Sequence, residues 1–331
     1  MRAWTSLILP AALLAGTTFA PGADAQMQPS APAAGGDQGD NAAGHGSVSI
    51  AYFNNYSNDF LLRSNFSLTE APGNPPEFGV VHMQGMGLDV RYNLSNDWTI
   101  YGGINYFTGR YNGLYVNCPT TAPPQCAHLP PLDPQHPEAP FVDDGNYHGA
   151  WQDWHFGVEW HAAIDDYFIT PSATAYIPTH DYPTFGNPVV GQNLSQLLLA
   201  VRLEHQFELT DFYYRLSYGY AFSQHVLGID TGYQRADGEL GWFVNERFSV
   251  NTFVTGRAGF GVRGPLAPLP YDTFFYERQR TAQHDYHAWG LGLNYDFGNR
   301  YSVSANVQHE FWGDTVYNFV YALEARLTRS F

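Results

Sequence analysis

Residues 317–331 decide the fold, and they read Tyr-Asn-Phe-Val-Tyr-Ala-Leu-Glu-Ala-Arg-Leu-Thr-Arg-Ser-Phe. In a β-strand, successive side chains point to opposite faces. One parity of this segment is apolar except at Arg329, and it comprises Phe331, Leu327, Ala325, Leu323, Tyr321, Phe319 and Tyr317. The other parity is mostly polar and comprises Ser330, Thr328, Arg326, Glu324, Ala322, Val320 and Asn318. The segment therefore predicts a strand with one apolar and one polar face.

The aromatic carboxyl end, Phe331, resembles the closing strand of bacterial outer-membrane β-barrels. In that class, a terminal Phe after alternating residues is part of the signal read by the barrel assembly machinery. The resemblance implies this machinery, and outer-membrane lipid, as partners of the chain. It requires that the rest of the chain supply more strands of the same kind.

The composition fits many short strands that face lipid. Charged residues make up 14% of the 331 residues and aromatic residues 16%, whereas about a quarter of a soluble domain is charged. After the first 20 positions there is no stretch of about 18 apolar residues, which excludes spanning helices. The net charge of −16 comes with 15 arginines and no lysine, and it argues against a nucleic-acid-binding surface.

The first 46 residues are set apart from the alternating region. Residues 1–25 have the pattern of a secretory signal peptide, with Arg2 at the start, an apolar core at 7–15 and a small-residue cleavage site at 23–25. Residues 26–46 are rich in Ala, Gly, Pro, Gln and Asp, which is typical of a flexible tail. We therefore expect a secreted chain with a periplasmic tail and a barrel over 47–331.

Twelve alternating segments follow the tail, at 47–56, 78–94, 98–109, 149–164, 167–178, 195–208, 212–223, 232–244, 248–262, 284–297, 301–312 and 317–331. Their apolar faces are aromatic near the strand ends, which favours the interfacial girdles of a membrane barrel over a soluble sandwich. Residues 57–70 could hold further strand or a short helix, so the strand count stays open by two.

The connections predict the topology. Five are tight and polar, and each is followed at once by an aromatic residue: Trp98, Tyr167, Phe212, Phe248 and Tyr301. Most of the other connections are much longer. Short turns on one side and long loops on the other are typical of outer-membrane barrels. We predict an all-β, transmembrane, up-and-down antiparallel barrel of about 12 strands, with short periplasmic turns and long extracellular loops, in the outer membrane of a Gram-negative bacterium.

Charged residues of both signs occupy the parity that would face the interior: Asp89, Asp153, Glu159, Glu204, Asp237, Glu239, Asp296, Glu310 and Glu324, with Arg91, Arg202, Arg215, Arg235, Arg257 and Arg326. Charges on the lipid side would be costly, so an inward orientation follows from the barrel. They either form a salt-bridged network that stiffens the barrel or line a polar path. The residues predicted to line a path are Arg202, Arg215, Arg235, Arg257, Glu159, Glu239 and Glu310.

The sequence predicts no catalytic, metal or cofactor site. It has no Gly-x-Ser-x-Gly elbow and no nucleotide loop. A Ser–His pair across strands, such as Ser223 with His225 or His284, stays open as a hypothesis. Cys118 and Cys126 lie in the Pro-rich loop 110–148 and are expected to form a disulfide, with two free thiols as the alternative.

Residues 176–187 read Tyr-Ile-Pro-Thr-His-Asp-Tyr-Pro-Thr-Phe-Gly-Asn and, with the strand rhythm, resemble the outer-membrane transporter family associated with the meta-cleavage pathway of phenol degradation. The resemblance implies a barrel over 47–331 that passes small solutes, hydrophobic or aromatic compounds included, and it assigns no binding residue. The first hypothesis is thus a passive channel or transporter for a small-molecule solute. The alternatives are a structural or surface-interaction barrel that acts through its long loops, and a lipid-acting enzyme. The chain could be monomeric or trimeric.

Overall fold

The computed structural model describes residues 42–61, 79–113, 145–184, 186, 188–262, 277–314 and 316–331. The predicted signal peptide, residues 26–41 of the predicted tail, and Cys118 and Cys126 lie outside these ranges. Within them, no helix is both long and apolar enough to cross a membrane. A helix of one turn, α2 (Arg278–Thr281), precedes the strand β11.

The described ranges form thirteen β-strands: β1 (Gly46–Leu61), β2 (Val80–Asn93), β3 (Trp98–Asn112), β4 (His148–Trp160), β5 (Ala162–Ile164), β6 (Tyr167–Pro178), β7 (Gln196–Gln206), β8 (Phe212–Ser223), β9 (Tyr233–Asn245), β10 (Phe248–Gly259), β11 (Asp285–Asp296), β12 (Tyr301–Asp314) and β13 (Val316–Ser330). The short β5 continues β4 in one register, because both pair with β6. The twelve long strands match the twelve predicted segments. β1 runs to Leu61, into the stretch that the sequence left open.

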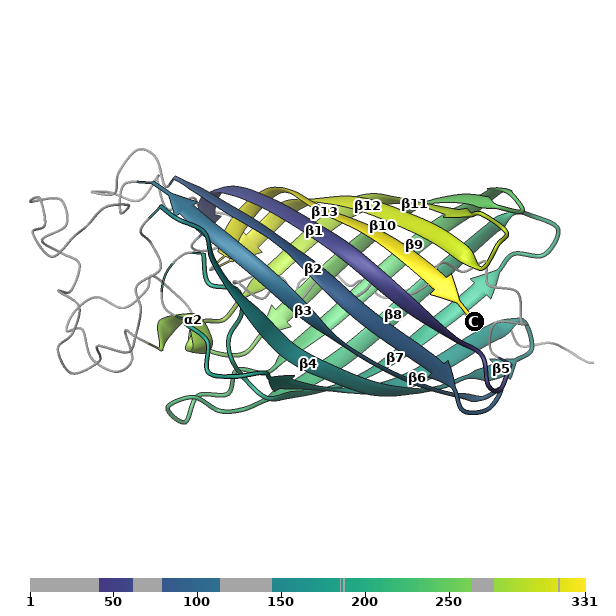
Figure 1. Cartoon of the computed structure of the whole chain (residues 1–331), viewed down its shortest axis with the longest axis horizontal. Helices are drawn as coiled ribbons and strands as arrows, with labels where there is room; N and C mark the ends of the chain where they lie inside the picture. Colours follow the sequence, from purple (N-terminus) through teal and green to yellow (C-terminus); the bar gives the residue numbers. More distant parts are fainter. Residues whose placement is uncertain are drawn as a thin grey trace, which may run out of the picture.

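The strands close into one antiparallel barrel (Figure 1). The first and last strands, β1 and β13, pair from Ser47 opposite Ser330 to Leu61 opposite Val316. The remaining seam is closed by β4 and β6. Closure removes the sheet edges that would otherwise expose unpaired backbone groups, as a membrane-spanning sheet requires. The predicted barrel of about 12 strands is confirmed.

The two ends of the barrel differ. The five tight connections lie at the end where the chain stops (Figure 1), and we call it the turn end. The strand ends that the longer connections join, and α2, lie at the opposite end, which we call the loop end. The alternation of short and long connections follows the prediction.

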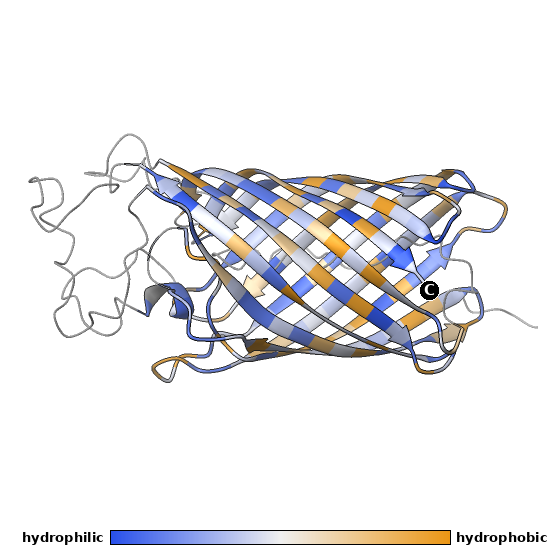
Figure 2. Cartoon of the chain, in the orientation of Figure 1, coloured by the Kyte–Doolittle hydropathy of each residue, from blue (hydrophilic) through white to orange (hydrophobic). Residues whose placement is uncertain are grey.

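The outer surface is apolar, and apolar and polar residues alternate along the strands (Figure 2). Exposed aromatic side chains gather near the turn end (Trp98, Trp160, Phe212, Trp242, Tyr301) and near the loop end (Trp151, Phe222, Trp289, Phe311). Between them the exposed residues are mainly aliphatic, such as Leu88, Leu216 and Leu291. Exposed apolar surface on this scale is a liability in water, but a band between two aromatic girdles is the normal exterior of a membrane barrel.

Two compensating irregularities shift the alternation between β1 and β13. The register changes between Tyr56 and Ser57 and again between Ser57 and Asp59. An extra residue in a strand reverses the side to which the following side chains point. As a result, Phe319 and Tyr317 are buried, although they share the sequence parity of the exposed Leu327. The prediction that all the apolar residues of 317–331 share one face is therefore wrong for these two residues.

A further bulge lies in β4. Ile104 of β3 pairs with Trp154, but Tyr106 pairs with Trp151, so two residues of β4 oppose one of β3. The two residues of β4 at the bulge, Gln152 and Asp153, are both buried. The bulge thus turns two consecutive polar side chains towards the barrel interior.

Candidate functional site

A chain of ion pairs, which we call the charged ladder, follows the inner wall nearer the turn end. It joins five strands, β2, β4, β7, β8 and β9, through Arg91, Glu159, Arg202, Glu204, Arg215 and Glu239. Arg215 Nε donates to Glu204 Oε1 at 2.5 Å, and its Nη1 donates to Glu239 Oε2 at 3.0 Å. Glu159 and Arg215 are the most buried members, at 6% and 8% exposure.

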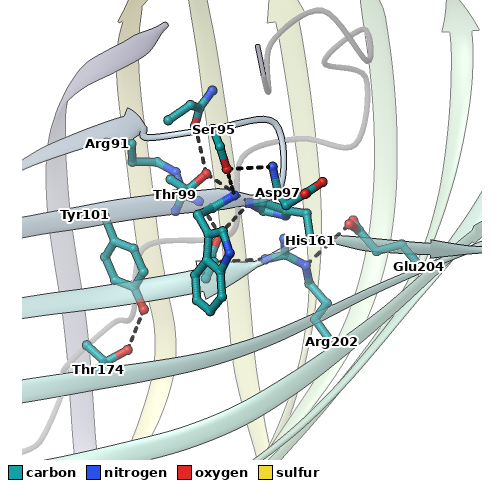
Figure 3. A network of polar contacts seen from close by, with 12 residues as sticks. Arg91, Ser95, Asp97, Thr99, Tyr101, His161, Thr174, Arg202 and Glu204 are labelled. Carbon is teal, nitrogen blue, oxygen red and sulfur yellow. Dashed lines mark hydrogen bonds and ion pairs between the residues drawn. The ribbon is translucent and has the colours of Figure 1, made fainter. Parts of the chain in front are cut away.

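Arg202 links the two halves of the charged ladder. Its Nε lies 3.4 Å from Glu204 Oε2, and its Nη1 lies 4.0 Å from Glu159 Oε1. Arg91 donates to the other oxygen of Glu159. Figure 3 shows this part of the wall, with Arg202 between His161 and Glu204. Every carboxylate of the charged ladder thus has a cationic partner, which offsets the cost of burying it.

A second group continues the charges across the β1–β13 seam. Arg326 Nη1 donates to Asp89 Oδ2 at 2.7 Å and its Nη2 donates to Glu324 Oε1 at 2.9 Å. His155 Nε2 lies 2.8 Å from the other oxygen of Asp89. The charges of β13, β2 and β4 are therefore one bonded cluster, and together with the charged ladder they cover the wall from β13 round to β9.

The charged side chains can meet because small residues occupy the strands between them. Gly103 of β3 sits between Asp89 and His155, and a Cβ at this glycine would lie 2.7 Å and 2.8 Å from their side chains. On β6, Ser172 is opposite Glu159, so Arg202 of β7 reaches Glu159 over a short side chain. Long charged groups on alternate strands, with short residues between them, produce a ladder that lies along the wall.

The other predicted path residues are placed differently. Arg235 Nη2 lies 3.0 Å from Asp237 Oδ1, and Arg257 lies over the ring of Tyr233 at 3.9 Å. These two arginines belong to β9 and β10, outside the charged ladder. Asp296 is exposed at the turn end, where it accepts a bond from the Gly298 amide at 2.7 Å.

Glu310 stands apart from all of these charges. The residue is 2% exposed. Its Oε2 accepts a long bond from the Phe319 amide at 3.4 Å, and its Oε1 has no hydrogen-bond partner within the part of the chain that the structure describes. The structure therefore brings Glu159, Arg202, Arg215 and Glu239 into one connected group and leaves Glu310 elsewhere.

Aromatic rings lie flat against the inner wall, over glycines of the neighbouring strand. A Cβ at Gly157 would lie 2.2 Å from Tyr101 Cζ, and one at Gly241 would lie 2.1 Å from Tyr213 Cζ. The hydroxyl groups also bond to the wall: Tyr213 donates to Glu239 at 2.9 Å, and Tyr101 lies 2.5 Å from Thr174 Oγ1. Rings held in this way cover the bare backbone of the glycines and do not cross the interior.

The loop-end half of the interior is apolar on the side of β1, β2 and β3. A buried cluster, which we call the aromatic chamber, consists of Phe53, Phe60, Met83, Val81, Phe107, Tyr111 and Tyr317, with Ala51 and Ala150. Tyr182 and Val190 belong to the same cluster, although they lie in the connection between β6 and β7. Residues 179–195, which we call the inner loop, therefore fold into the barrel and narrow this half of it.

The inner loop is held by the bulge of β4. Tyr182 Oη donates to Asp153 at 2.9 Å and accepts from the Asn193 amide at 3.0 Å. Gln152 donates to the Val190 carbonyl. The β4 bulge was not predicted, because the alternation of polar and apolar residues does not distinguish an extra residue within a strand from the end of that strand. The only sign of the bulge in the sequence was the pair of consecutive polar residues at 152–153.

The helix α2 braces the inner loop from the other side. Gln279 donates to the Gly186 carbonyl at 3.0 Å, and Arg280 Nε donates to the Gln192 carbonyl at 3.1 Å. The described residues of the distinctive stretch 176–187 thus belong to a constriction built by two loops and one strand.

The described ranges contain no group of three or more His, Cys, Asp or Glu residues arranged to hold a metal ion. The hydroxyl of Ser223 is buried and has no hydrogen-bond partner among the described residues. The hypothetical Ser–His pair at this residue is therefore not formed.

Comparison with known proteins defines the fold. No family model and no curated protein matches the chain. Among solved structures, the COG4313 outer membrane channel from Pseudomonas putida F1 is similar with a TM-score of 0.60 and 9% identity, over 87% of this chain and 96% of that chain. This similarity shows that the chain has the fold of an outer-membrane β-barrel. The predicted membership of the phenol-degradation transporter family stays a prediction.

Two further neighbours are similar at lower scores. The NanC porin has a TM-score of 0.45 and 10% identity, over 86% of this chain and 98% of that chain. The TodX deltaS2S3 mutant monoaromatic hydrocarbon channel has a TM-score of 0.43 and 9% identity, over 87% of this chain and 90% of that chain. These scores are too low to support an argument about function.

Proposed function

We propose that this chain is an outer-membrane channel that passes small solutes passively, hydrophobic or aromatic compounds included. The observation that carries the proposal is the sorting of side chains across a single-layered wall. Exposed apolar and aromatic side chains cover the outside, and bonded charges line the inside. This arrangement suits a polar path through lipid. The turn end then faces the periplasm and the loop end faces the exterior.

The path has two zones of different chemistry. A solute that enters from outside meets the inner loop and the aromatic chamber first. It then meets the charged ladder, where Arg202, Arg215 and Glu239 present charges of both signs. A compound with an apolar ring and a polar group has favourable contacts in both zones. This is the physical basis for including aromatic compounds among the solutes.

Planar-bilayer conductance of the refolded chain tests the proposal. We expect a steady conductance whose ion selectivity depends on the charged ladder. Arg215→Ala removes a cation bonded to Glu204 and Glu239, so the reversal potential should shift towards cation selectivity. Glu239→Ala removes an anion, and the shift should have the opposite sign. Arg247→Ala, in the exposed turn between β9 and β10, is the matched control and should leave the selectivity unchanged.

The outcomes separate the proposal from its alternatives. A folded, heat-modifiable barrel without conductance or solute flux would contradict a channel and would favour a surface-interaction role of the long loops. Conductance with the same reversal potential in all three variants would contradict the charged ladder as the selective zone. We assign no catalytic step to the chain, and activity on phospholipid or lipopolysaccharide would overturn that assignment.

A further inference from the structure

Three adjacent strands carry polar side chains on their outward face near the loop end. Asn54 of β1, Gln84 of β2 and Thr108 of β3 lie opposite one another, and the next row towards the loop end is Tyr56, His82 and Arg110. The two rows on the other side are apolar or aromatic: Tyr52, Met86 and Tyr106, then Ile50, Leu88 and Ile104. The lipid-facing wall therefore changes from apolar to polar within one row.

Three polar residues of these rows, Asn54, His82 and Arg110, are linked by contacts through His82 and Tyr147. His82 Nδ1 lies 2.5 Å from Tyr147 Oη, and His82 Nε2 lies 3.1 Å from Asn54 Nδ2. The guanidinium of Arg110 lies over the Tyr147 ring, 4.8 Å from its centroid. We call Asn54, His82, Gln84, Thr108, Arg110 and Tyr147 the outer polar patch. Its members are half-buried or exposed. Contacts on the barrel itself orient Asn54, His82, Arg110 and Tyr147.

The position of the patch along β3 sets its level in the membrane. From Trp98 at the turn end to Arg110 there are 110 − 98 = 12 residues. At about 3.3 Å per residue and a strand tilt of about 40°, this distance is about 30 Å along the membrane normal. The apolar band of an outer-membrane barrel is about 25 Å tall. Arg110 therefore lies at the level of the lipid headgroups of the outer leaflet.

Arg110 also differs from the arginines of the interior. Arg91, Arg215 and Arg326 each have a carboxylate partner, whereas no carboxylate of the described residues forms an ion pair with Arg110. Asp59, an acidic residue farther along β1, is not a partner of this kind: its carboxylate accepts a hydrogen bond from the Phe60 amide at 2.7 Å. A guanidinium that is stacked on an aromatic ring keeps its donors in one plane, which suits a phosphate group.

We propose that the outer polar patch binds the phosphorylated sugar headgroup of a glycolipid in the outer leaflet. Arg110 contacts the phosphate, while the amides of Asn54 and Gln84 and the hydroxyl of Thr108 contact sugar hydroxyls. Charge and hydrogen-bonding capacity favour a glycolipid over a phospholipid, because a glycerol headgroup has few hydroxyls for the amides. The site lies on the outside of the wall and is independent of solute passage through the interior.

Lipid titration of the full chain in detergent, followed by native mass spectrometry, tests the site. The probes are lipopolysaccharide with a truncated, phosphorylated core, the same material after phosphatase treatment, and phosphatidylglycerol. We expect the phosphorylated lipopolysaccharide to bind most tightly. Arg110→Gln should weaken its binding about tenfold, as expected for one charge-assisted contact. Phosphatase treatment should weaken its binding to the unmodified chain by a similar factor.

Arg329→Gln is the matched control, because Arg329 is an exposed arginine of β13 near the turn end. This variant should bind the phosphorylated lipopolysaccharide as the unmodified chain does. Heat-modifiable migration in electrophoresis would establish that both variants are folded. Equal binding by Arg110→Gln and Arg329→Gln would overturn the proposal. So would phosphatidylglycerol binding as tight as that of lipopolysaccharide, or the absence of lipopolysaccharide binding by the unmodified chain.

Discussion

Gly241→Ala should displace the ring of Tyr213 from the wall and narrow the barrel. A Cβ at this position would lie 2.1 Å from Tyr213 Cζ and 2.4 Å from its Oη. Ordinary contact begins near 3.4 Å, so the ring must move by at least 3.4 − 2.1 = 1.3 Å. This movement strains the bond from Tyr213 to Glu239, which measures 2.9 Å. Overpacking costs about 1–3 kcal/mol, and a lost bond to a charged group costs about 1.5–3 kcal/mol.

We therefore expect Gly241→Ala to lower the free energy of unfolding by about 2.5–6 kcal/mol and to reduce single-channel conductance. The free energy is measured by urea titration in lipid vesicles, and the conductance in planar bilayers. Gly238→Ala is the matched control on the same strand, since the nearest side-chain atoms to its Cβ lie at 3.6 Å. That substitution should be neutral or slightly stabilising, because alanine has less backbone freedom to lose than glycine.

The double variant Gly241→Ala with Tyr213→Ser separates a steric cause from a general weakness of β9. Removal of the ring should restore the conductance, although it does not restore the bond to Glu239. Equal stability and equal conductance of Gly241→Ala and Gly238→Ala would refute the reasoning. It would mean that Tyr213 has another position on the wall at no cost.

Two further substitutions test the buried charges. Arg326→Ala leaves the carboxylates of Asp89 and Glu324 without this partner, and it should lower the free energy of unfolding by about 3–5 kcal/mol. A loss below 1 kcal/mol in urea titration would contradict the bonded cluster. Glu310→Gln should leave stability unchanged or raise it, because Glu310 has no cationic partner among the described residues and the amide carries no charge to bury. A loss above 2 kcal/mol would contradict this assignment.

The strands and turns could be predicted from the sequence because they depend on local alternation. In β12, for example, Val303, Ala305 and Val307 alternate with Ser304 and Asn306, and each face is determined by its own residues. The same local alternation is enough to predict that the side chains of Arg215 and Glu239 point into the barrel. Alternation fails where a bulge adds a residue, so the burial of Phe319 and the inward direction of Gln152 could not be predicted.

The partners of the charged ladder could not be predicted, because they depend on the register between strands. Glu159 and Arg202 belong to β4 and β7, with β6 between them. They meet only because Ser172 is short and lies opposite Glu159. The inner loop has the same difficulty. Tyr182 is an ordinary loop residue in sequence, and its burial depends on Asp153 lying in the bulge of another strand.

The cluster around Arg326 has a consequence for the order in which the barrel is completed. Asp89 and Arg326 are 237 positions apart, so their bond is formed across nearly the whole barrel sequence. During synthesis, residues of β2 exist long before those of β13, and β1 lacks one of its two neighbours until the chain is finished. Pairing over such a separation is slow to find, since the entropy of closing a long loop must be lost first. The ion pair between Asp89 and Arg326 therefore forms late in folding. A chain that lacks β13 leaves Asp89 without this arginine, and β1 can pair with β13 only after the last strand has been made.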